Sequence, residues 1–431
     1  MGESRPNAAE HEMLGLLDSW CDELMELVCT AVRVPSVTGE EGAFGSMVAG
    51  WLADHGLESY SHTVASDLKR REGGFDAEHD LERRPNVFGW LRGNGAGGAP
   101  LVLSTHQDVV SPGARDAWSR DPWSGDRDRG RIWGRGAADM KGAIAAALFA
   151  LRAVREADLA PACDVEFQCV VAEESGGLGT LSALETEPLP SAAVVLEPSE
   201  CVVRAACSGC VHFTVAVEGR SAHGATPWMG VSALDKLIAL YGALQTLAER
   251  RRREQDHELF AALPDGAPLC MGIARAGEWR STVAERAHMT GRLGVMPGES
   301  LAHGREEILE ALRRLAADDH WLREHPPVVS WDNAGFAAWD TDQGAPIVEA
   351  IAGACEAVTG NHELGAVTFG SDAGHFAQRL VPVVIFGPGR ITDAHAPDES
   401  VSEEQILTAA KVLALTIARY RPARRADEVA A

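Results

Sequence analysis

The sequence predicts an α/β protein in which a mostly parallel sheet is flanked by helices and interrupted by a ferredoxin-like insert. Three observations support this prediction. The chain has 431 residues, which is more than one ordinary hydrophobic core takes. Uninterrupted apolar runs alternate with helical segments in its first and last parts, as expected for buried parallel strands. Between them, from about residue 207 to 331, the pattern changes to alternating strands and amphipathic helices.

The first elements are predicted to be helical. Residues 16–33 carry apolar side chains at helical spacing. Thr38 and Glu41 have the spacing of a capping box, which predicts a second helix ending near His55. The charged, glycine-containing segment Ser66–Arg84 shows no period and indicates a surface insertion.

Four apolar runs then end next to chemically reactive side chains. A strong helix is predicted between the first two runs, over residues 141–156. The runs and the residues that follow them are Leu101–Thr105 before His106, Val165–Ala172 before Glu173 and Glu174, Ala192–Leu196 before Glu197, and Val381–Phe386 before a Gly-Pro-Gly turn that leads to His395. Ligands of parallel sheets bind beyond the carboxyl ends of the strands, so the position of these side chains indicates a site.

The middle of the chain predicts a separate small domain. Its elements are a strand over 211–218, a helix over 231–252, strands near 269–274 and 286–295, a helix over 300–316, and a last strand near Val328. This β-α-β-β-α-β order is typical of a ferredoxin-like fold. We therefore expect residues 207–331 to form an inserted domain, and residues 1–206 and 332–431 to form the two parts of one larger domain.

Composition excludes several classes of function. The formal net charge is −24, with 63 acidic and 39 basic side chains, which argues against nucleic acid as a partner. No apolar run is long enough to span a bilayer, and no secretion signal is visible, so no membrane partner is expected. Nine scattered cysteines fit reduced thiols in the cytoplasm.

The reactive residues each allow an ordinary structural interpretation as well. His106 and Asp108 could belong to a polar loop, and Asp139 could only cap the helix that follows it. The adjacent Glu173 and Glu174 could be a solvated strand end, although two neighbouring carboxylates repel unless cations or protons compensate them.

Together, these residues favour a metal site. Two histidines and four carboxylates suit zinc, cobalt or manganese. A carboxylate shared between two metals would hold them about 3.5–4 Å apart, as in hydrolytic two-metal sites. The set is His106, Asp139, Glu173, Glu174, Glu197 and His395.

From about residue 15 to 418 the chain resembles the M20 metallopeptidase family. This group includes aminoacylases, acetylornithine deacetylase, succinyl-diaminopimelate desuccinylase and carboxypeptidase G2. The resemblance is carried by THQDVV, GRGAADMKG, AEESGG, EPS and DAHAPDE, which occur in the family's order. It implies a di-zinc exopeptidase-like catalytic domain and a lid domain, and it implies hydrolysis of amide bonds.

The resemblance also implies a role for each residue. Five side chains would hold two divalent metals, zinc first and cobalt or manganese as alternatives: His106 and Glu197 on one, Glu174 and His395 on the other, and Asp139 on both. Glu173 would be the general base, and Asp108 would orient His106. A cis peptide is expected between Asp139 and Met140.

In the insert, the resemblance implies dimerisation and contacts with substrate. Residues 207–331 would form a homodimer, in which His223 reaches the partner's active site and polarises the scissile carbonyl. Arg292 would bind a substrate carboxylate, and the loop with Gly370 and Ser371 would cradle the substrate. The stretch 278–284 departs from the family, because it lacks the Asn-x-x-Pro segment of many members.

These features predict an amidohydrolase that cleaves a small N-acyl amino acid or a related N-acyl amine. A dipeptidase or carboxypeptidase is one alternative, and a deformylase acting on an amide that is not an amino acid is another. A catalytically silent binding protein is the least favoured reading, because every ligand position and the base are present.

Overall fold

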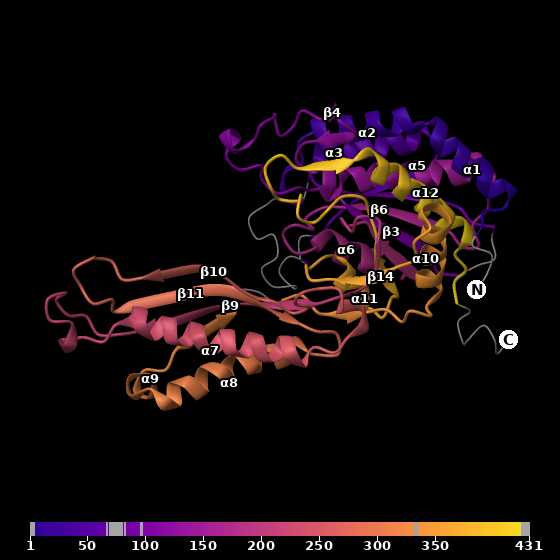
Figure 1. Cartoon of the computed structure of the whole chain (residues 1–431). Coiled ribbons are helices and arrows are strands. Elements are labelled where there is room, and N and C mark those ends of the chain that lie inside the picture. Colours follow the sequence, from indigo (N-terminus) through magenta and orange to yellow (C-terminus); the bar gives the residue numbers. More distant parts are fainter. Residues whose placement is uncertain are drawn as a thin grey trace. The chain divides into compact units, whose positions relative to one another are not determined.

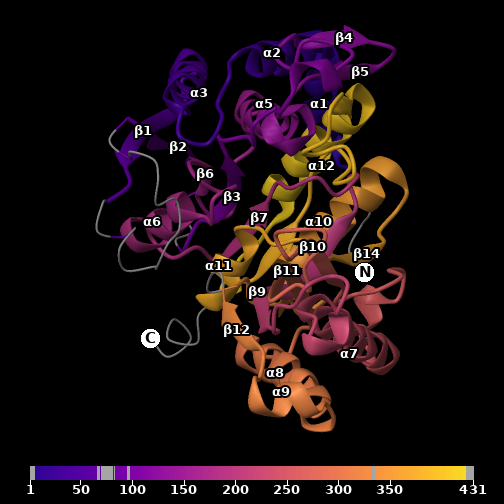
Figure 2. The same ribbon diagram turned by 90° about the vertical axis from the view of Figure 1, so that its left-hand side faces the viewer.

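A computed structural model describes residues 5–65, 68, 81, 83–94, 98–331 and 335–423. The chain forms two compact units (Figures 1 and 2). Unit 1 consists of Met1–Ala205, Thr341–Gly365 and Ser371–Ala431, and unit 2 consists of Ala206–Asp340 and Ala366–Gly370. Unit 2 thus takes in residues beyond 331 that we had assigned to the larger domain. Most of the predicted insertion Ser66–Arg84 lies outside the described residues.

The central sheet of unit 1 is built around four parallel strands, as predicted. They are β6 (Val165–Val170), β3 (Leu101–His106), β7 (Ala192–Val195) and β15 (Val383–Ile385), in that order. Antiparallel strands continue the sheet on both sides. Beyond β6 lie β2 (Pro85–Leu91) and β1 (Glu58–Thr63). Beyond β15 lies β8 (Val203–Cys207), and β14 (Leu364–Val367) pairs with β8. Every residue of β3, β6 and β7 is buried, because helices cover both faces of the sheet.

The helices of unit 1 lie on both sides of this sheet (Figure 1). On one side are α1 (Ala8–Ser19), α2 (Cys21–Arg33), α3 (Gly42–Asp54), α5 (Gly142–Glu156) and α12 (Glu403–Arg419); on the other are α6 (Leu178–Thr186) and α11 (Ala373–Gln378). Helix α10 (Pro346–Thr359) packs on α12. Helix α5 is buried along most of its length. Because many of its side chains are alanine, α12 can pack closely against it. A small antiparallel sheet adds β4 (Asp126–Asp128), β5 (Arg131–Trp133) and β16 (Ser400–Ser402).

Two local predictions about the N-terminal helices are wrong. The helix expected over 16–33 is broken at Trp20, which leaves helical geometry and separates α1 from α2. The capping box expected at Thr38 and Glu41 does not form, because both side chains have other partners: Thr38 donates to Asp108, and Glu41 accepts two hydrogen bonds from Arg84. Helix α3 therefore begins without a side-chain cap.

Unit 2 has the predicted ferredoxin-like topology. Its elements are β9 (Gly209–Glu218), α7 (Ala233–Glu254), β10 (Leu269–Ala276), β11 (Arg286–Val295), α8 (Leu301–Asp318), α9 (His320–Glu324), β12 (Val328–Trp331) and β13 (Trp339–Asp340). The main sheet runs β10-β11-β9-β12, and each neighbouring pair is antiparallel. Strand β13 instead pairs with Ala206 and Cys207.

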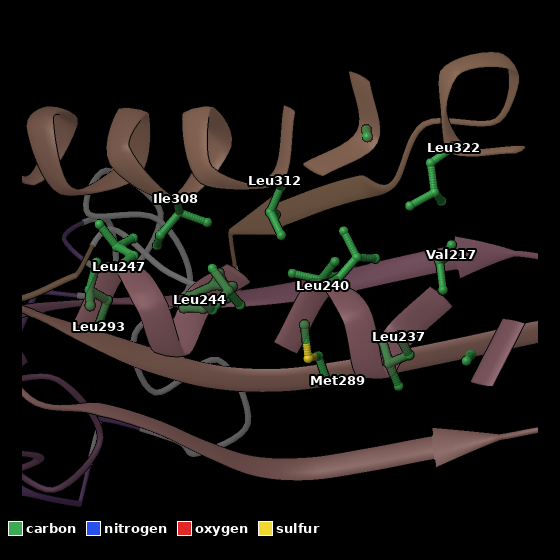
Figure 3. Close-up of a cluster of buried hydrophobic side chains, with 14 of the residues drawn as sticks. Val217, Leu237, Leu240, Leu244, Leu247, Met289, Leu293, Ile308, Leu312 and Leu322 are labelled. Carbon is green, nitrogen blue, oxygen red and sulfur yellow. The ribbon is translucent and has the colours of Figure 1, made fainter. Parts of the chain in front are cut away.

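The core of unit 2 lies between this sheet and its two long helices (Figure 3). Leu237, Leu240 and Leu244 project from α7 at helical spacing and meet Met289 of β11 and Ile308 of α8. The same spacing continues to the ends of the helices, so one apolar face of each helix is buried on the sheet. Among the described residues, no helix combines the length and the apolarity that crossing a bilayer takes.

Candidate metal centre

The carboxyl ends of the parallel strands bring the predicted ligands of unit 1 together. His106 is the last residue of β3, Glu173 and Glu174 follow β6, and Glu197 follows β7. His106, Glu173 and Glu197 have ligand atoms within 4.8 Å of one another, and so have His106, Asp139 and Glu174. The common position that the sequence suggested for these side chains thus corresponds to one cluster in space.

Asp139 lies between the two histidines of the cluster. Its Oδ1 is 3.0 Å from Nε2 of His106, and its Oδ2 is 3.4 Å from Nε2 of His395. The residue belongs to a short turn, Ala137–Lys141, that precedes α5, and it has non-helical φ and ψ angles. The peptide bond to Met140 is cis, as expected from the resemblance.

The remaining pairs extend the cluster on either side of Asp139. His395 Nε2 lies 3.1 Å from Oε1 of Glu174. On the other side, His106 Nε2 lies 4.0 Å from Oε1 of Glu197. Each carboxylate oxygen of Asp139 therefore lies beside one histidine, and each of these histidines lies near one glutamate.

The electrostatics of the cluster favour bound cations. Burial raises the pKa of Glu173 well above its usual range, and the charges of Glu197 and Asp372 raise it further. Burial likewise raises the pKa of Glu174 and Glu197. Hydrogen bonds to Asp139 and Glu174 raise the pKa of His395 to about 10. Carboxylates crowded in this way need positive charge, which protons or metal ions can provide. The donor set thus fits metal ions.

Asp108 is expected to orient His106 with its carboxylate, and the structure shows a different contact. Its backbone carbonyl, rather than its carboxylate, accepts the Nδ1 hydrogen bond of His106, at 2.8 Å. Its carboxylate accepts the backbone N–H groups of Glu173 and Glu174, at 3.1 and 3.2 Å, and the hydroxyl of Thr38, at 2.9 Å. One residue therefore holds both the imidazole and the turn that follows β6.

Glu399 has no role predicted from the sequence, although it lies in the DAHAPDE motif. Its Oε1 accepts the N–H groups of Ala138 and Asp139, at 2.9 and 3.2 Å. Its Oε2 pairs with Nη1 of Arg135 at 2.6 Å, and both side chains are buried. The position of Glu399 four residues after His395 was the available signal.

Asp372 and Thr180 were also missed. Asp372 is buried beside Ser371, and its carboxylate accepts the hydroxyl of Thr180 at 2.6 Å. A Cβ atom on Gly177, which has a φ of +78°, would lie 2.3 Å from this carboxylate, so the turn after Glu174 requires glycine there. The hydroxyl of Ser371 is buried and has no partner among the described residues.

The other predicted substrate contacts lie in unit 2. His223 is exposed, and its Nδ1 accepts the N–H of Ala225, so the neutral ring carries its proton on Nε2. Arg292 donates through Nη2 to the carbonyl of Thr368 at 2.9 Å, and its buried Nε has no partner within the described part of the chain. Gly370 packs against the ring of Phe336, which a Cβ atom would approach to 2.8 Å.

The sequence profile of peptidase family M20/M25/M40 matches residues 102–419, which include every residue of the cluster. The chain belongs to this family. It is accordingly an amide-bond hydrolase of the M20 group. The resemblance recognised from the motifs is thereby confirmed.

Curated relatives match this M20 chain over most of its length. An N-formyl-4-amino-5-aminomethyl-2-methylpyrimidine deformylase from Halalkalibacterium halodurans is 27% identical over 435 residues, covering 96% of this chain and 98% of the relative. An acetylornithine deacetylase from Edwardsiella ictaluri is 25% identical over 404 residues, covering 90% and 95%.

Solved structures of M20 proteins share the fold at low identity. Human carnosine dipeptidase 1 has a TM-score of 0.71 at 18% identity and covers 96% of this chain and 99% of its own. The YXEP protein of Bacillus subtilis, described as a dinuclear metal-binding peptidase of the family, has a TM-score of 0.60 at 14% identity and covers 93% and 98%. The predicted fold class is confirmed.

Proposed function

We propose that this chain hydrolyses the amide bond of a small N-acyl amino acid or related N-acyl amine and that it uses two divalent metal ions. The observation that carries the proposal is Asp139, whose two carboxylate oxygens face His106 and His395 separately. His106 and Glu197 would complete one site, and Glu174 and His395 would complete the other. Zinc is the first expectation for such ligands, with cobalt or manganese as alternatives.

The proposed metals and Glu173 divide the chemistry. Bound metals would supply Lewis acidity, which lowers the pKa of a water molecule and polarises the acyl carbonyl. Glu173 would take the proton from the attacking water and deliver it to the leaving amine. Its backbone N–H is held by Asp108, so the position of the base is tied to that of His106.

A homodimer would complete the site with His223 of the partner subunit. An Nε2–H group can stabilise the negative charge that develops on the carbonyl oxygen. Two features of unit 2 support association with a second copy. Helix α7 exposes Leu234, Ile238 and Tyr241 as an apolar stripe, at helical spacing and on the flank of the helix beside its buried face. Strand β10 ends the sheet, with its outer side exposed.

The surroundings of Arg292 support the proposal that the substrate carries an acidic group. Its side chain is fixed through Thr368, while its Nε is buried and unpaired among the described residues. A guanidinium in this state is suited to a carboxylate, which it can bind with two parallel hydrogen bonds. An N-acyl amino acid carries such a carboxylate.

A deformylase acting on an aminopyrimidine is the second candidate. It is favoured by the relative from Halalkalibacterium halodurans, which covers 96% of this chain. Such a substrate has no carboxylate for Arg292 to bind. Arg292→Ala should therefore raise KM toward N-acyl amino acids but leave KM toward a formylaminopyrimidine unchanged.

We also propose a cytoplasmic location, which the nine free cysteines support.

The test is an activity screen with a matched variant of the base. Wild-type protein loaded with zinc, cobalt or manganese is assayed on N-acetyl, N-formyl, N-succinyl and dipeptide substrates. Glu173→Gln should lower kcat by about 10²–10⁴-fold, because it removes general base catalysis but no proposed ligand. Its metal content should stay at two ions per chain. Near-normal turnover by this variant, or a wild-type chain that binds no metal, would overturn the proposal.

A further inference from the structure

We propose that Glu399 and Arg135 are positioning residues that fix Asp139 between the two metal sites. This inference rests on the proposed function, because it concerns the affinity of the same site for metals. Neither side chain would touch a metal or the substrate. They act through the backbone of the residue that would bridge the metals.

The contacts of Glu399 converge on one short stretch of main chain. Its Oε1 accepts both the Ala138 and the Asp139 N–H groups. Asp139 precedes α5 and has φ −125° and ψ 92°, and its N–H group takes no part in the hydrogen bonds of that helix. A buried N–H without a partner is costly, and the carboxylate supplies that partner. The conformation of Asp139 therefore depends on a carboxylate at position 399.

Arg135 holds the carboxylate in place from the other side. Its Nη1 lies 2.6 Å from Oε2 of Glu399, and the side chains are 2% and 1% exposed. The guanidinium packs over the ring of Trp118, with its central carbon 5.1 Å from the ring centroid. The backbone N–H of Arg135 donates to Pro122. A buried pair restrained in this way has little freedom to move, which suits a positioning role.

The same contacts tie the two halves of the cluster together. Glu399 lies four residues after His395, and its carbonyl accepts the N–H of Gly134, at 2.8 Å. The segment that carries His395 is thus attached to the segment that carries Asp139 at both the side chain and the backbone of Glu399. Asp139 Oδ2 and His395 Nε2 are 3.4 Å apart, and Glu399 fixes this distance through its contacts with the backbone.

The experiment measures metal binding by the full chain. Zinc affinity is obtained by competition with a coloured chelator, and the visible absorption spectrum of the cobalt-loaded protein reports ligand geometry. Glu399→Gln should weaken zinc binding by about 10–100-fold, as is usual when residues behind metal ligands are changed. The cobalt spectrum should change as well. Unchanged zinc affinity and an unchanged spectrum would overturn the inference.

A matched control separates positioning from general stability. Glu10 is a buried carboxylate that binds Arg419 with two hydrogen bonds, at 2.8 and 2.9 Å, and links α1 to α12. Glu10→Gln should lower the thermal unfolding midpoint of the metal-free chain but leave zinc affinity as in the wild type. If Glu10→Gln weakened zinc binding as much as Glu399→Gln, the specific role of Glu399 would be refuted.

A double variant covers the case in which Glu399→Gln leaves Arg135 as an unpaired buried charge and does not fold. Glu399→Gln combined with Arg135→Gln replaces the ion pair by a neutral pair, which proteins often tolerate. The folded double variant should again bind zinc about 10–100-fold more weakly. Wild-type zinc affinity in this variant would count against the inference. A wild-type chain without zinc affinity would instead contradict the proposed function.

Discussion

Asp108 holds two parts of the site with two different groups. Its backbone carbonyl fixes His106, and its carboxylate oxygens fix the N–H groups of Glu173 and Glu174. A substitution of the Asp108 side chain should therefore affect the turn with Glu173 and Glu174 but leave the hydrogen bond to His106 in place. Because Glu174 and His395 would hold one metal and His106 and Glu197 the other, the two metals should respond differently.

Asp108→Asn should weaken one metal selectively. An asparagine has one acceptor oxygen and one amino group, so it cannot accept both N–H bonds of the turn. We expect one of the two zinc equivalents to bind about 10–100-fold more weakly, while the other keeps its affinity. A stepwise zinc titration measures both. Thr38→Val, which removes one neutral donor to the same carboxylate, is the milder control. Equal weakening of both equivalents would contradict this division.

At the residue scale, the sequence located the candidate ligands better than it located their supports. Each ligand of the parallel strands follows an apolar run, and that local signal is visible in the chain itself. Glu399, Asp372 and Thr180 act through contacts with residues far away in the sequence, such as Ala138 at a separation of 261 positions. No spacing rule connects residues that distant.

Strand β6 contains a buried carboxylate, Glu166, near the end of the strand that lies away from Glu173. Glu166 is fully buried, and among the described residues its one hydrogen bond comes from Gln168 to Oε1, while Oε2 has no partner. Burial raises the pKa of Glu166 to about 8. Between these two pKa values the carboxyl group of Glu166 is protonated in the native chain but ionised in the unfolded chain, whose pKa is near 4.5.

The sign of the resulting pH dependence follows from this difference. Between about pH 4.5 and 8 the native state binds one more proton at Glu166 than the unfolded state. The stability contributed by this group is complete below pH 4.5 and falls as the pH rises to 8, by up to about 1.4 kcal/mol per pH unit.

Glu166→Gln should remove this fall. The difference in the free energy of unfolding between the metal-free variant and the metal-free wild type should shift in favour of the variant from pH 5 to pH 8, by on the order of 2–4 kcal/mol. Thermal unfolding midpoints at the two pH values, in the presence of a chelator, measure the difference. An equal effect of the substitution at both pH values would show that Glu166 does not carry the proton.

Helices and strands were predicted well where the spacing of apolar residues determines them. They were predicted less well where tertiary contacts of single side chains determine the start or end of a helix. The strands and helices of unit 2 follow from alternating and helical spacing. Helices α1 and α2 were merged because the break at Trp20 has no glycine or proline to mark it. The ring of Trp20 packs instead against Arg152 and Phe149 of α5, a tertiary contact that the local sequence does not reveal.

On the scale of the whole molecule, the proposed dimer predicts complementation between inactive variants. His223→Ala and Glu173→Gln should each be inactive as homodimers. In a heterodimer, one site has Glu173 and receives His223 of the partner subunit, while the other site lacks both. We therefore expect tagged heterodimers to recover about half of the wild-type activity per dimer.

The interface supplies the control for this experiment. Ile238 on α7 is 61% exposed, so Ile238→Asp should not disturb the core of unit 2 but should oppose association. Sedimentation should then detect monomers, and complementation should disappear. A wild-type chain that sediments as a monomer with full activity would refute the proposal that His223 acts across a dimer.

The interrupted chain order of unit 1 has a consequence for synthesis on the ribosome. Strand β15 pairs with β7 on one side and β8 on the other, yet it follows both by about 180 residues. All of 206–340 emerges in between, and this stretch contains the whole ferredoxin-like topology. The ferredoxin-like part of unit 2 can therefore fold while β7 still lacks its second neighbour, as domains often do during translation. The proposed metal centre includes His395, so it can form only after the last tenth of the chain has begun to emerge.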